Sequence, residues 1–576
     1  MTVTQTLWKH VTQLPALIWL KHYPLSSLQA DAMAALIVTV MLIPQSLAYA
    51  MLAGLPPETG LYASILPLLA YALFGSSRTL SVGPVAVISL LSANAVGIAH
   101  IASGLDVLTL SMGLAFLSGM LMLIMGLFRL GFIANLLGRP VITGFITAAG
   151  LLIALGQLKH ILGIPLVGHN LPELVLGLLQ YGQDAHLLTA VVGISSMVFL
   201  WLGRSPLRQF LCRFMSQSNA SALSKMAPVS AVIIAILLVE NLDLDQQGVI
   251  VVGHIPAGLP RLAWPEMSGL LVSTLMPSAV MISLIGYVES ISVAQNLANK
   301  RHQKIDPNHE LLGLGAANIA SATSGGFAVT GGFSRSVVNF DAGAKTPMAG
   351  VLAAVGIALA SLYLTPYLAL LPKAVLGATI FVAVVTLIEP QEITFTWKYS
   401  KHDFAAMMIT IGMVLFVGVE AGVMAGVVAT ISLMLWRTSR PHTAVVGPVA
   451  GGQHFRNIDR HKVEQFEQVI ALRIDESLFF GNVRYLDNQL NELLARNPCI
   501  EHLILMASGI NHIDSSAVES LLEFNQRLHD QGIKMHLSEV KGPVLDRLQR
   551  INFAGQLTGT IYLSQHQAWQ ELTKPC

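Results

Sequence analysis

Apolar segments of membrane-spanning length follow one another as far as about residue 440. DAMAALIVTVMLIPQSLAYAMLAG and ITAAGLLIALGQL are apolar over nearly their whole length, and about 20 such residues let a helix cross a bilayer core of roughly 30 Å. The pattern predicts about fourteen spans, several of them too short to cross alone. We place them near residues 30–51, 58–75, 82–96, 104–127, 132–157, 186–203, 227–241, 272–298, 309–325, 332–343, 347–370, 373–389, 402–418 and 419–437.

The pattern changes after residue 440, where Glu, Asn, Gln, Arg and His become frequent. EQVIALRID, IEHLILMASGI and IKMHLSEV are typical of β-strands, and SSAVESLLEFNQRLHDQG is typical of an amphipathic helix. This alternation predicts an α/β domain. We therefore predict a transmembrane domain over residues 1–440, a linker containing Pro and Gly over 441–465, and an α/β domain over 466–576.

Basic residues are unevenly distributed among the predicted connections. With the N-terminus inside, the outer connections hold Lys159, Arg261 and Lys373, and the inner ones hold Arg78, Arg129, Arg139, Arg204, Arg208, Arg213, Lys225, Lys300, Arg301, Lys304, Lys345, Lys398 and Lys401. Cytoplasmic connections are enriched in Lys and Arg. An even number of spans then leaves both termini in the cytoplasm. The first residues have no small-residue cleavage site, so we expect no removable signal peptide.

The composition excludes an ordinary soluble protein, because charged residues make up 11% and apolar residues 53%, with a mean hydropathy of +0.64. The net charge of +1 and the lack of basic, aromatic-rich runs argue against nucleic acid as a partner. The three cysteines have neither disulfide nor metal-ligand spacing. No catalytic triad or phosphate-binding loop is present. We expect no enzyme, cofactor or metal.

Two short segments suggest internal symmetry. SVGPVAVISLL and VTGGFSRSVV both place glycine at the start of a short apolar segment, and they lie about 250 residues apart. Paired short segments of this kind are typical of transporters with inverted repeats, whose binding site lies where the broken helices meet. About seven spans in each repeat make the repeats inverted rather than parallel. The alternative is coincidence in a glycine-rich membrane protein.

Arg335 lies three residues after Gly332 in GGFSRSVVNFDAGAKTP. If a helix begins after Gly332, its free N–H groups and positive dipole end favour an anion. A second helix start after Gly83 would supply a facing N-terminus. This grouping predicts a site for a small anion, with further hydroxyl donors from Ser334 and Ser336. The alternative is a structural arginine satisfied by backbone carbonyls or by an interface, although charges inside membranes usually mark function.

Glu289 is the one acid in MISLIGYVESISVAQNLANK. It lies about eleven residues before Lys300, which places it roughly 16 Å deep, close to the membrane midplane. A carboxylate that binds and releases a proton there could carry the proton alongside an anion. Two alternatives are a fixed ion pair with Arg335 and a sodium site completed by nearby hydroxyls, those of Ser283, Ser290 and Ser292.

Gln45 and Tyr49 stand four residues apart in IPQSLAYA, so they share one face of a helix. Both side chains can donate hydrogen bonds to an oxyanion. Packing between helices explains the pair equally well.

Several blocks in order resemble the SulP/SLC26 anion transporter family over nearly the whole chain. These blocks are IPQSLAYAMLAGLPPETGLYASILPLLAYALFGSSRTLSVGPVAV, GRPVITGFITAAGLLIALGQL, VESISVAQNLANK and TGGFSRSVVNFDAGAKTP. The resemblance implies an α-helical polytopic membrane domain with 14 spans in a 7+7 inverted repeat, with a UraA-like moving core and fixed gate. It also implies a homodimer and an elevator-like motion. In that pattern the substrate site comprises Gln45, Tyr49, Gly83, Val85, Gly332, Phe333, Ser334 and Arg335, and Glu289 is the acid of the eighth span.

The C-terminal part resembles the STAS domain. HIDSSAVESL matches the loop where anti-sigma-factor antagonists carry a phosphorylatable serine, which is Ser515 here. Asp514-Ser515-Ser516 is also an ordinary helix N-cap sequence. The resemblance implies a cytoplasmic location and allows a regulatory partner at this domain.

The substrate is the least determined feature. A glutamate in the eighth span together with FSRS in the tenth resembles the proton-coupled sulfate permeases, whereas sodium-coupled bicarbonate relatives tend to have an aspartate there and to lack this arginine. A divalent oxyanion also suits a guanidinium and two dipole ends. We predict a proton–sulfate symporter of the cell (inner) membrane. The alternatives are a bicarbonate or C4-dicarboxylate transporter coupled to protons or sodium, an anion exchanger or channel, and a motor or sensor acting through the STAS domain.

Overall fold

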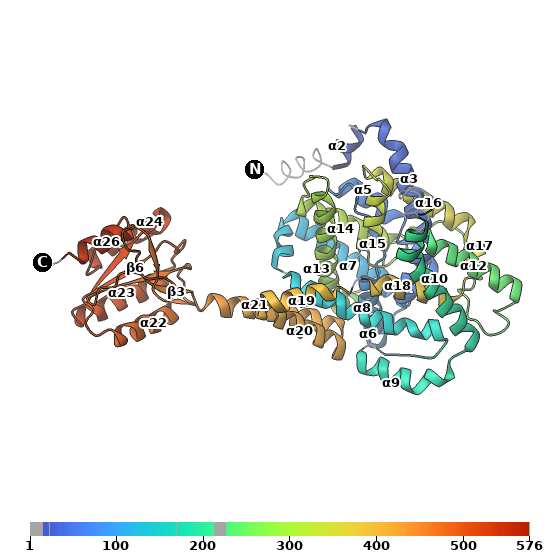
Figure 1. Ribbon diagram of the computed structural model, residues 1–576. Coiled ribbons are helices and arrows are strands. Elements are labelled where there is room, and N and C mark those ends of the chain that lie inside the picture. Colours follow the sequence, from blue (N-terminus) through green and yellow to red (C-terminus); the bar gives the residue numbers. More distant parts are fainter. Residues whose placement is uncertain are drawn as a thin grey trace. The chain divides into compact units, whose positions relative to one another are not determined.

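The computed structural model describes residues 15–21, 23–136, 138–168, 170–211, 213, 226–386 and 388–574. The chain divides into two compact units, and the boundary follows Thr430. In its described residues the first unit is helical apart from one small two-stranded sheet, and the second is built on a six-stranded sheet (Figure 1).

Long apolar helices dominate the first unit. Seven helices in the described part of the chain are long and apolar enough to cross a membrane, and each predicted span overlaps a helix. This part is therefore a multi-pass membrane domain, while the count of 14 spans stays a prediction. The longer helices are α3 (Leu28–Leu52), α6 (Ala86–Ser103), α7 (Val107–Leu127), α8 (Arg139–Leu162), α10 (Leu187–Leu211), α12 (Ala227–Leu242), α13 (Gly269–Asn299), α14 (Pro307–Thr323), α16 (Met348–Tyr363), α18 (Lys373–Val385), α20 (Lys401–Phe416) and α21 (Val419–Thr438).

Shorter helices account for the differences from the predicted spans. The span at 58–75 is divided into α4 (Pro57–Tyr62) and α5 (Leu66–Phe74), because Pro67 starts a helix more readily than it continues one. The span expected at 82–96 extends to Ser103 as α6. The span at 347–370 is likewise divided, into α16 and the short α17 (Thr365–Leu368). Further helices lie outside the predicted spans, namely α2 (Pro15–Lys21), α9 (Leu171–Tyr181) and α19 (Pro390–Tyr399).

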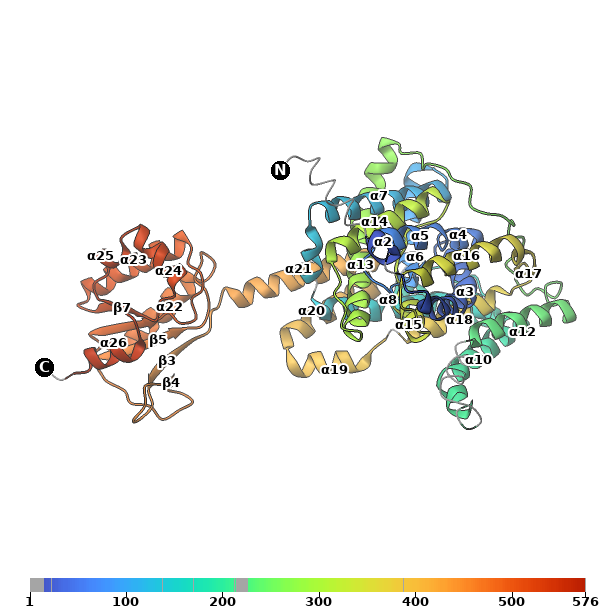
Figure 2. The same cartoon turned by 90° about the horizontal axis from the view of Figure 1, so that it is seen from above.

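The helices of the first unit pack in two groups. In one group, α14 packs along α7 and α5, α13 along α7 and α6, and α16 along α3 (Figure 2). In the other, α8 packs against α18 and α20, and α10 packs against α18 and α12. The groups meet where α3 contacts α18 and α12. The assignment of these groups to a moving core and a fixed gate stays a prediction.

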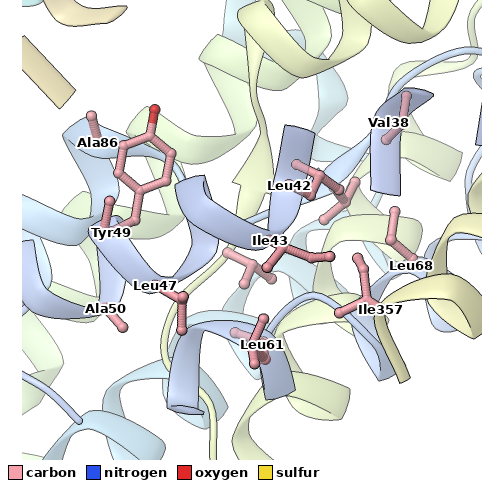
Figure 3. Close-up of a cluster of buried hydrophobic side chains, with 14 of the residues drawn as sticks. Val38, Leu42, Ile43, Leu47, Tyr49, Ala50, Leu61, Leu68, Ala86 and Ile357 are labelled. Carbon is pink, nitrogen blue, oxygen red and sulfur yellow. The ribbon is translucent and has the colours of Figure 1, made fainter. Parts of the chain in front are cut away.

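The centre of the first group is a tightly packed apolar cluster around α3. Leu42 and Leu47 of α3 are fully buried, with Leu61 of α4, Leu68 of α5 and Ile357 of α16 around them (Figure 3). Inside a membrane, close packing rather than exclusion of water holds helices together. The cluster therefore fixes the position of α3 and of the polar residues that follow in its second half.

Two fully buried carboxylates connect the two halves of the membrane domain. Asp31 of α3 accepts hydrogen bonds from the backbone N–H groups of residues 345–346, at 2.7 and 3.2 Å. Glu310 of α14 accepts bonds from the N–H groups of residues 76–77, both at 2.9 Å, and from the Tyr71 hydroxyl at 2.7 Å. Buried charges are tolerated when several donors satisfy them. Each half thus supplies the acid that holds a connection of the other half.

The second unit is an α/β sheet with helices on both faces. The strand order is β4 (Phe455–Asn457), β3 (Thr443–Pro448), β5 (Val469–Ile474), β6 (His502–Met506), β7 (Lys534–Ser538) and β8 (Ile561–Tyr562). β5 to β8 are parallel, with Leu472 opposite Leu505 and Leu505 opposite Leu537, and β3 is antiparallel to both neighbours. One face packs on α22 (Val483–Arg496), α23 (Ser515–Asp530) and α24 (Gly542–Arg550), and the other on α26 (Gln565–Leu572).

The predicted linker at 441–465 contains two of these strands, β3 and β4, so that part of the expected domain division is wrong. Pro448 and Gly447 suggested a linker, but both lie at the end of β3 beside the short edge strand β4. Proline is tolerated near the edge of a sheet because few ladder hydrogen bonds depend on its missing N–H.

Candidate functional site

Two interrupted segments cross in the middle of the first group of helices. β1 (Val82–Gly83) pairs with β2 (Thr330–Gly331) in an antiparallel arrangement, with Val82 opposite Gly331. α6 begins three residues after β1, and α15 (Phe333–Asp341) begins two residues after β2. The chain is therefore not continuously helical at either glycine site, as the sequence pattern predicted. Pro84 directly precedes the α6 N-cap, Val85.

Polar contacts from α13 and α14 hold this crossing in place. The Gly331 N–H donates to Ser290 Oγ at 2.8 Å, Ser290 and Thr330 hydroxyls are 2.6 Å apart, and the Thr330 hydroxyl donates to the Gly286 carbonyl at 2.6 Å. The Asn318 side chain bonds both the N–H and the carbonyl of Val329, each at 2.9 Å. The extended backbone, which cannot satisfy itself inside a membrane, thus obtains its partners from side chains.

Arg335 lies in the first turn of α15 and is only 2% exposed. Its Nη2 donates to the Pro84 carbonyl, which links α15 to the chain entering α6. Its Nη1 is buried and has no hydrogen-bond partner among the described residues. A Cβ atom on Gly83 would overlap this Nη1, so glycine there gives the guanidinium its space. An unpaired buried cationic donor is costly unless a ligand completes it.

A small pocket brings together most of the predicted site residues. Its volume is about 30 Å³, which is room for about two water molecules. α3 contributes Gln45 and Tyr49, which are 6% and 7% exposed and lie on one helix face as expected. The Tyr49 ring lies beside Ala86, and its hydroxyl points away from the Leu42–Leu61 cluster (Figure 3). The remaining lining comes from Pro84, Val85, Ala86, Glu289, Gly332, Phe333, Ser334, Arg335, Ala383 and Val384.

Glu289 lines this pocket and also a neighbouring apolar one formed by residues of α8, α13 and α21. Its Oε2 is buried without a hydrogen-bond partner among the described residues. Glu289 and Arg335 interact electrostatically but form no ion pair within 4 Å in the described structure. The three hydroxyls considered for a sodium site are engaged with other atoms: Ser283 with Ala279 and Ser118, Ser290 with Thr330, and Ser292 with Val288.

Sequence reasoning anticipated the lining that comes from α3, α15 and the chain entering α6, and missed the wall that comes from α18. Ala383 and Val384 of α18 line the pocket, and no polar or charged residue near them in the sequence indicated a binding site. Ser336, expected as a donor to the anion, instead accepts a hydrogen bond from the Ser81 N–H at 3.0 Å. A serine in the first turn of a helix can serve either the ligand or the neighbouring backbone, and spacing alone does not distinguish these roles.

Ser515 lies in the second unit, as the exposed first residue of α23. The cap is formed by Asp514, whose Oδ1 accepts a bond from the Ala517 N–H at 2.8 Å and whose Oδ2 accepts one from the Phe480 N–H at 2.9 Å. The Ser515 hydroxyl is therefore not needed for capping. Its phosphorylation stays a prediction.

Broken helices that meet at a buried cation, within a multi-pass helical domain, define a membrane transport protein with an appended α/β domain. The sequence pattern of the "Sulfate permease family" matches residues 28–410, and that of the "STAS domain" matches residues 460–568. The chain belongs to the sulfate permease (SulP/SLC26) family of anion transporters. It is a transporter and not an enzyme.

Curated relatives align with this chain over most of its length and over about four fifths of their own. "Sulfate transporter 4.1, chloroplastic" of Arabidopsis thaliana is 33% identical over 545 residues, which cover 92% of this chain and 77% of the relative. "High affinity sulfate transporter 2" of Stylosanthes hamata is 31% identical over 560 residues, covering 94% and 83%.

Solved structures support the fold. Murine Solute Carrier 26 family member A9, an anion transporter solved in the inward-facing state, superposes with a TM-score of 0.86 at 23% identity, over 97% of this chain and 94% of that one. The transmembrane domain of the cyanobacterial bicarbonate transporter BicA gives a TM-score of 0.58 at 21% identity, over 71% of this chain and 98% of that one. The expected membrane fold with a C-terminal STAS domain is confirmed.

Proposed function

We propose that this chain is a proton-coupled sulfate symporter and that its substrate site is the pocket around Arg335. One observation carries the proposal: the buried Arg335 Nη1 has no hydrogen-bond partner among the described residues, at the junction of two helix starts. Partly fixed by the Pro84 carbonyl, the guanidinium needs little reorganisation to accept an oxyanion. The α6 and α15 N-termini add further positive potential.

The same pocket supports proton coupling. Glu289 presents a second buried polar atom without a partner, Oε2, close enough to Arg335 to interact electrostatically. Protonation of Glu289 would remove a negative charge that otherwise competes with the incoming anion for the guanidinium. Sulfate and proton binding are then mutually favourable, and such linkage is reciprocal.

Alternating access is proposed to come from movement of one helix group against the other. The pocket contains Arg335 and Tyr49 from the first group and Ala383 and Val384 from the second. Sliding α3, α6, α13 and α15 as a block along α18 would carry the anion past a smooth apolar wall. We propose a homodimer because the family resemblance implies one, and cytoplasmic termini because Lys and Arg concentrate in the predicted inner connections.

Sulfate is favoured by the names of the relatives, which are sulfate transporters, and the small size of the pocket disfavours the larger C4-dicarboxylates. Bicarbonate and C4-dicarboxylate transport, sodium coupling, and exchanger or channel behaviour are the alternatives. The three hydroxyls near Glu289 are engaged elsewhere, which disfavours a sodium site built on them.

The deciding experiment is uptake of labelled sulfate, bicarbonate and fumarate by one proteoliposome preparation, with and without an inward proton gradient. We expect saturable sulfate uptake that the gradient accelerates. Arg335→Ala should abolish uptake in a protein that still folds, whereas Arg261→Ala, which removes an exposed arginine outside the pocket, should leave uptake unchanged. Unitary currents, or equal uptake by Arg335→Ala and wild type, would contradict the proposal.

A further inference from the structure

A second, larger pocket lies at one end of the helical unit. Its volume is about 1040 Å³, and it is formed by α2 and by three connections, at residues 75–78, 301–309 and 343–347. α2 and α9 lie at opposite ends of this unit (Figure 1). The pocket shares no lining residue with the pocket around Arg335. Its residues come from segments far apart in the sequence.

The pocket is strongly basic. Arg78, Arg301 and Lys345 line it, and no Asp or Glu occurs among the described residues that do. The position of the Arg301 guanidinium is fixed, because it donates to the carbonyls of Ala344 and Phe340 and lies 4.1 Å from the centre of the Phe340 ring. The nearby Asp31 is fully buried, and residues 345–346 already engage it. Asp306 of the 301–309 connection pairs with His309 at 3.0 Å, and none of the three cations forms an ion pair within 4 Å in the described part of the chain.

One wall of the same pocket is apolar and aromatic. Trp19 of α2 lines it beside Pro15 and Pro24. The Trp19 Nε1–H donates to the Ala72 carbonyl at 3.1 Å, and the ring packs edge-on against Tyr23 at 6.5 Å. Trp and Tyr concentrate where a membrane protein passes the lipid headgroups. A pocket with a basic side and an aromatic side suits an amphipathic anion.

We propose that this pocket binds the phosphate headgroup of an anionic phospholipid. Arginine and lysine together recognise phosphate oxygens through charge-assisted hydrogen bonds, and basic pockets between membrane helices bind acidic headgroups. The apolar wall would accept the glycerol and the start of the acyl chains. Because the three basic connections come from both halves of the chain, a bound headgroup would bridge the halves.

The test measures lipid binding by the purified full-length protein in detergent. Native mass spectrometry would give apparent dissociation constants for dioctanoyl-phosphatidylglycerol and for dioctanoyl-phosphatidylcholine. The test variant is Arg78→Gln/Lys345→Gln, because both side chains are exposed and neither forms a hydrogen bond or an ion pair with another described residue. Lys304→Gln is the matched control: it removes the same charge from a residue that is exposed but does not line the pocket.

We expect phosphatidylglycerol to bind about 30-fold more weakly to the double variant, or about five-fold for each cation, and Lys304→Gln to bind within two-fold of wild type. If the double variant does not fold, Arg78→Gln alone should show the five-fold loss. Equal binding of the two lipids, or no loss in the variants, would overturn the proposal. Inorganic phosphate binding as tightly as phosphatidylglycerol, with the same loss, would assign the site to a soluble phosphate group and overturn the lipid.

Discussion

Gly83→Ala tests whether the space beside Arg335 is functional. A Cβ at this position would overlap Arg335 Nη1, would lie 3.3 Å from Cζ, and would lie 3.6 Å from Ser64 Oγ. The overlapped atom is the end of a flexible side chain, so the guanidinium can move and the fold should survive. Movement would separate Nη2 from the Pro84 carbonyl and take Nη1 away from the pocket.

The magnitude follows from the loss of a charge-assisted hydrogen bond to the anion, about 1.5–3 kcal/mol. This corresponds to a KM for sulfate that is about 10- to 150-fold higher. The assay is the initial rate of sulfate uptake by proteoliposomes over a range of sulfate concentrations. Gly97→Ala in α6, the helix that follows Gly83, is the control, because a Cβ there meets no atom within 4 Å.

A KM for Gly83→Ala within two-fold of the wild-type value would refute the reasoning. A second check uses the Arg335→Ala background, where the obstructing guanidinium is absent. There, Gly83→Ala should leave the melting temperature of the purified protein unchanged. A further drop would show that the alanine acts on the backbone crossing and not through Arg335.

Three further outcomes are expected. Glu289→Gln should still bind sulfate but lose the acceleration of uptake by an inward proton gradient, since glutamine keeps the size and cannot carry the proton; accumulation driven by that gradient would contradict the role. Ser290→Ala should lower the free energy of unfolding by about 1–3 kcal/mol, because the buried Gly331 N–H loses its acceptor. Ser292→Ala is the control, because the Ser292 hydroxyl bonds a carbonyl of its own helix; equal melting temperatures for the two variants would contradict the role of Ser290. Burial, with His502 and Lys534 nearby, lowers the pKa of His536 from 6.5 to about 4, so the folded domain loses stability as the pH falls from 6.5 toward 4, by about 2 kcal/mol at pH 5. Hydrogen exchange at β7 and β8 in the full chain should become faster over that range, and an exchange rate that does not change with pH would exclude this titration.

The sequence predicted the parts of the site that cost free energy to maintain. A charge in an apolar segment and a break in a membrane helix both cost free energy, so they usually indicate a function. Arg335, Glu289 and the interruptions near Gly83 and Gly332 could therefore be identified from the sequence. The structure brings these residues to one pocket, with Gly83 behind the guanidinium. Their roles in binding and coupling stay predictions.

Other features could not be inferred because their signals are shared with ordinary packing. Ala383 and Val384 of α18 are as apolar as residues that face lipid, so nothing marked them as a pocket wall. Gly447 and Pro448 are as typical of a linker as of the end of a strand, so β3 could not be predicted from them. Ser336 had two suitable partners, and only the position of Ser81 after folding decides between them.

The reciprocal carboxylates have a consequence for how the chain is made. While the ribosome has delivered only the first half, Asp31 lacks its donors at residues 345–346, and a buried group left without its hydrogen-bond partners costs about 1–3 kcal/mol, or more when it is charged. We therefore expect the connection around Asp31 to stay unformed until the second half is inserted, when Glu310 also reaches the N–H groups of residues 76–77. Neither half, expressed as a separate gene product, should mature without the other.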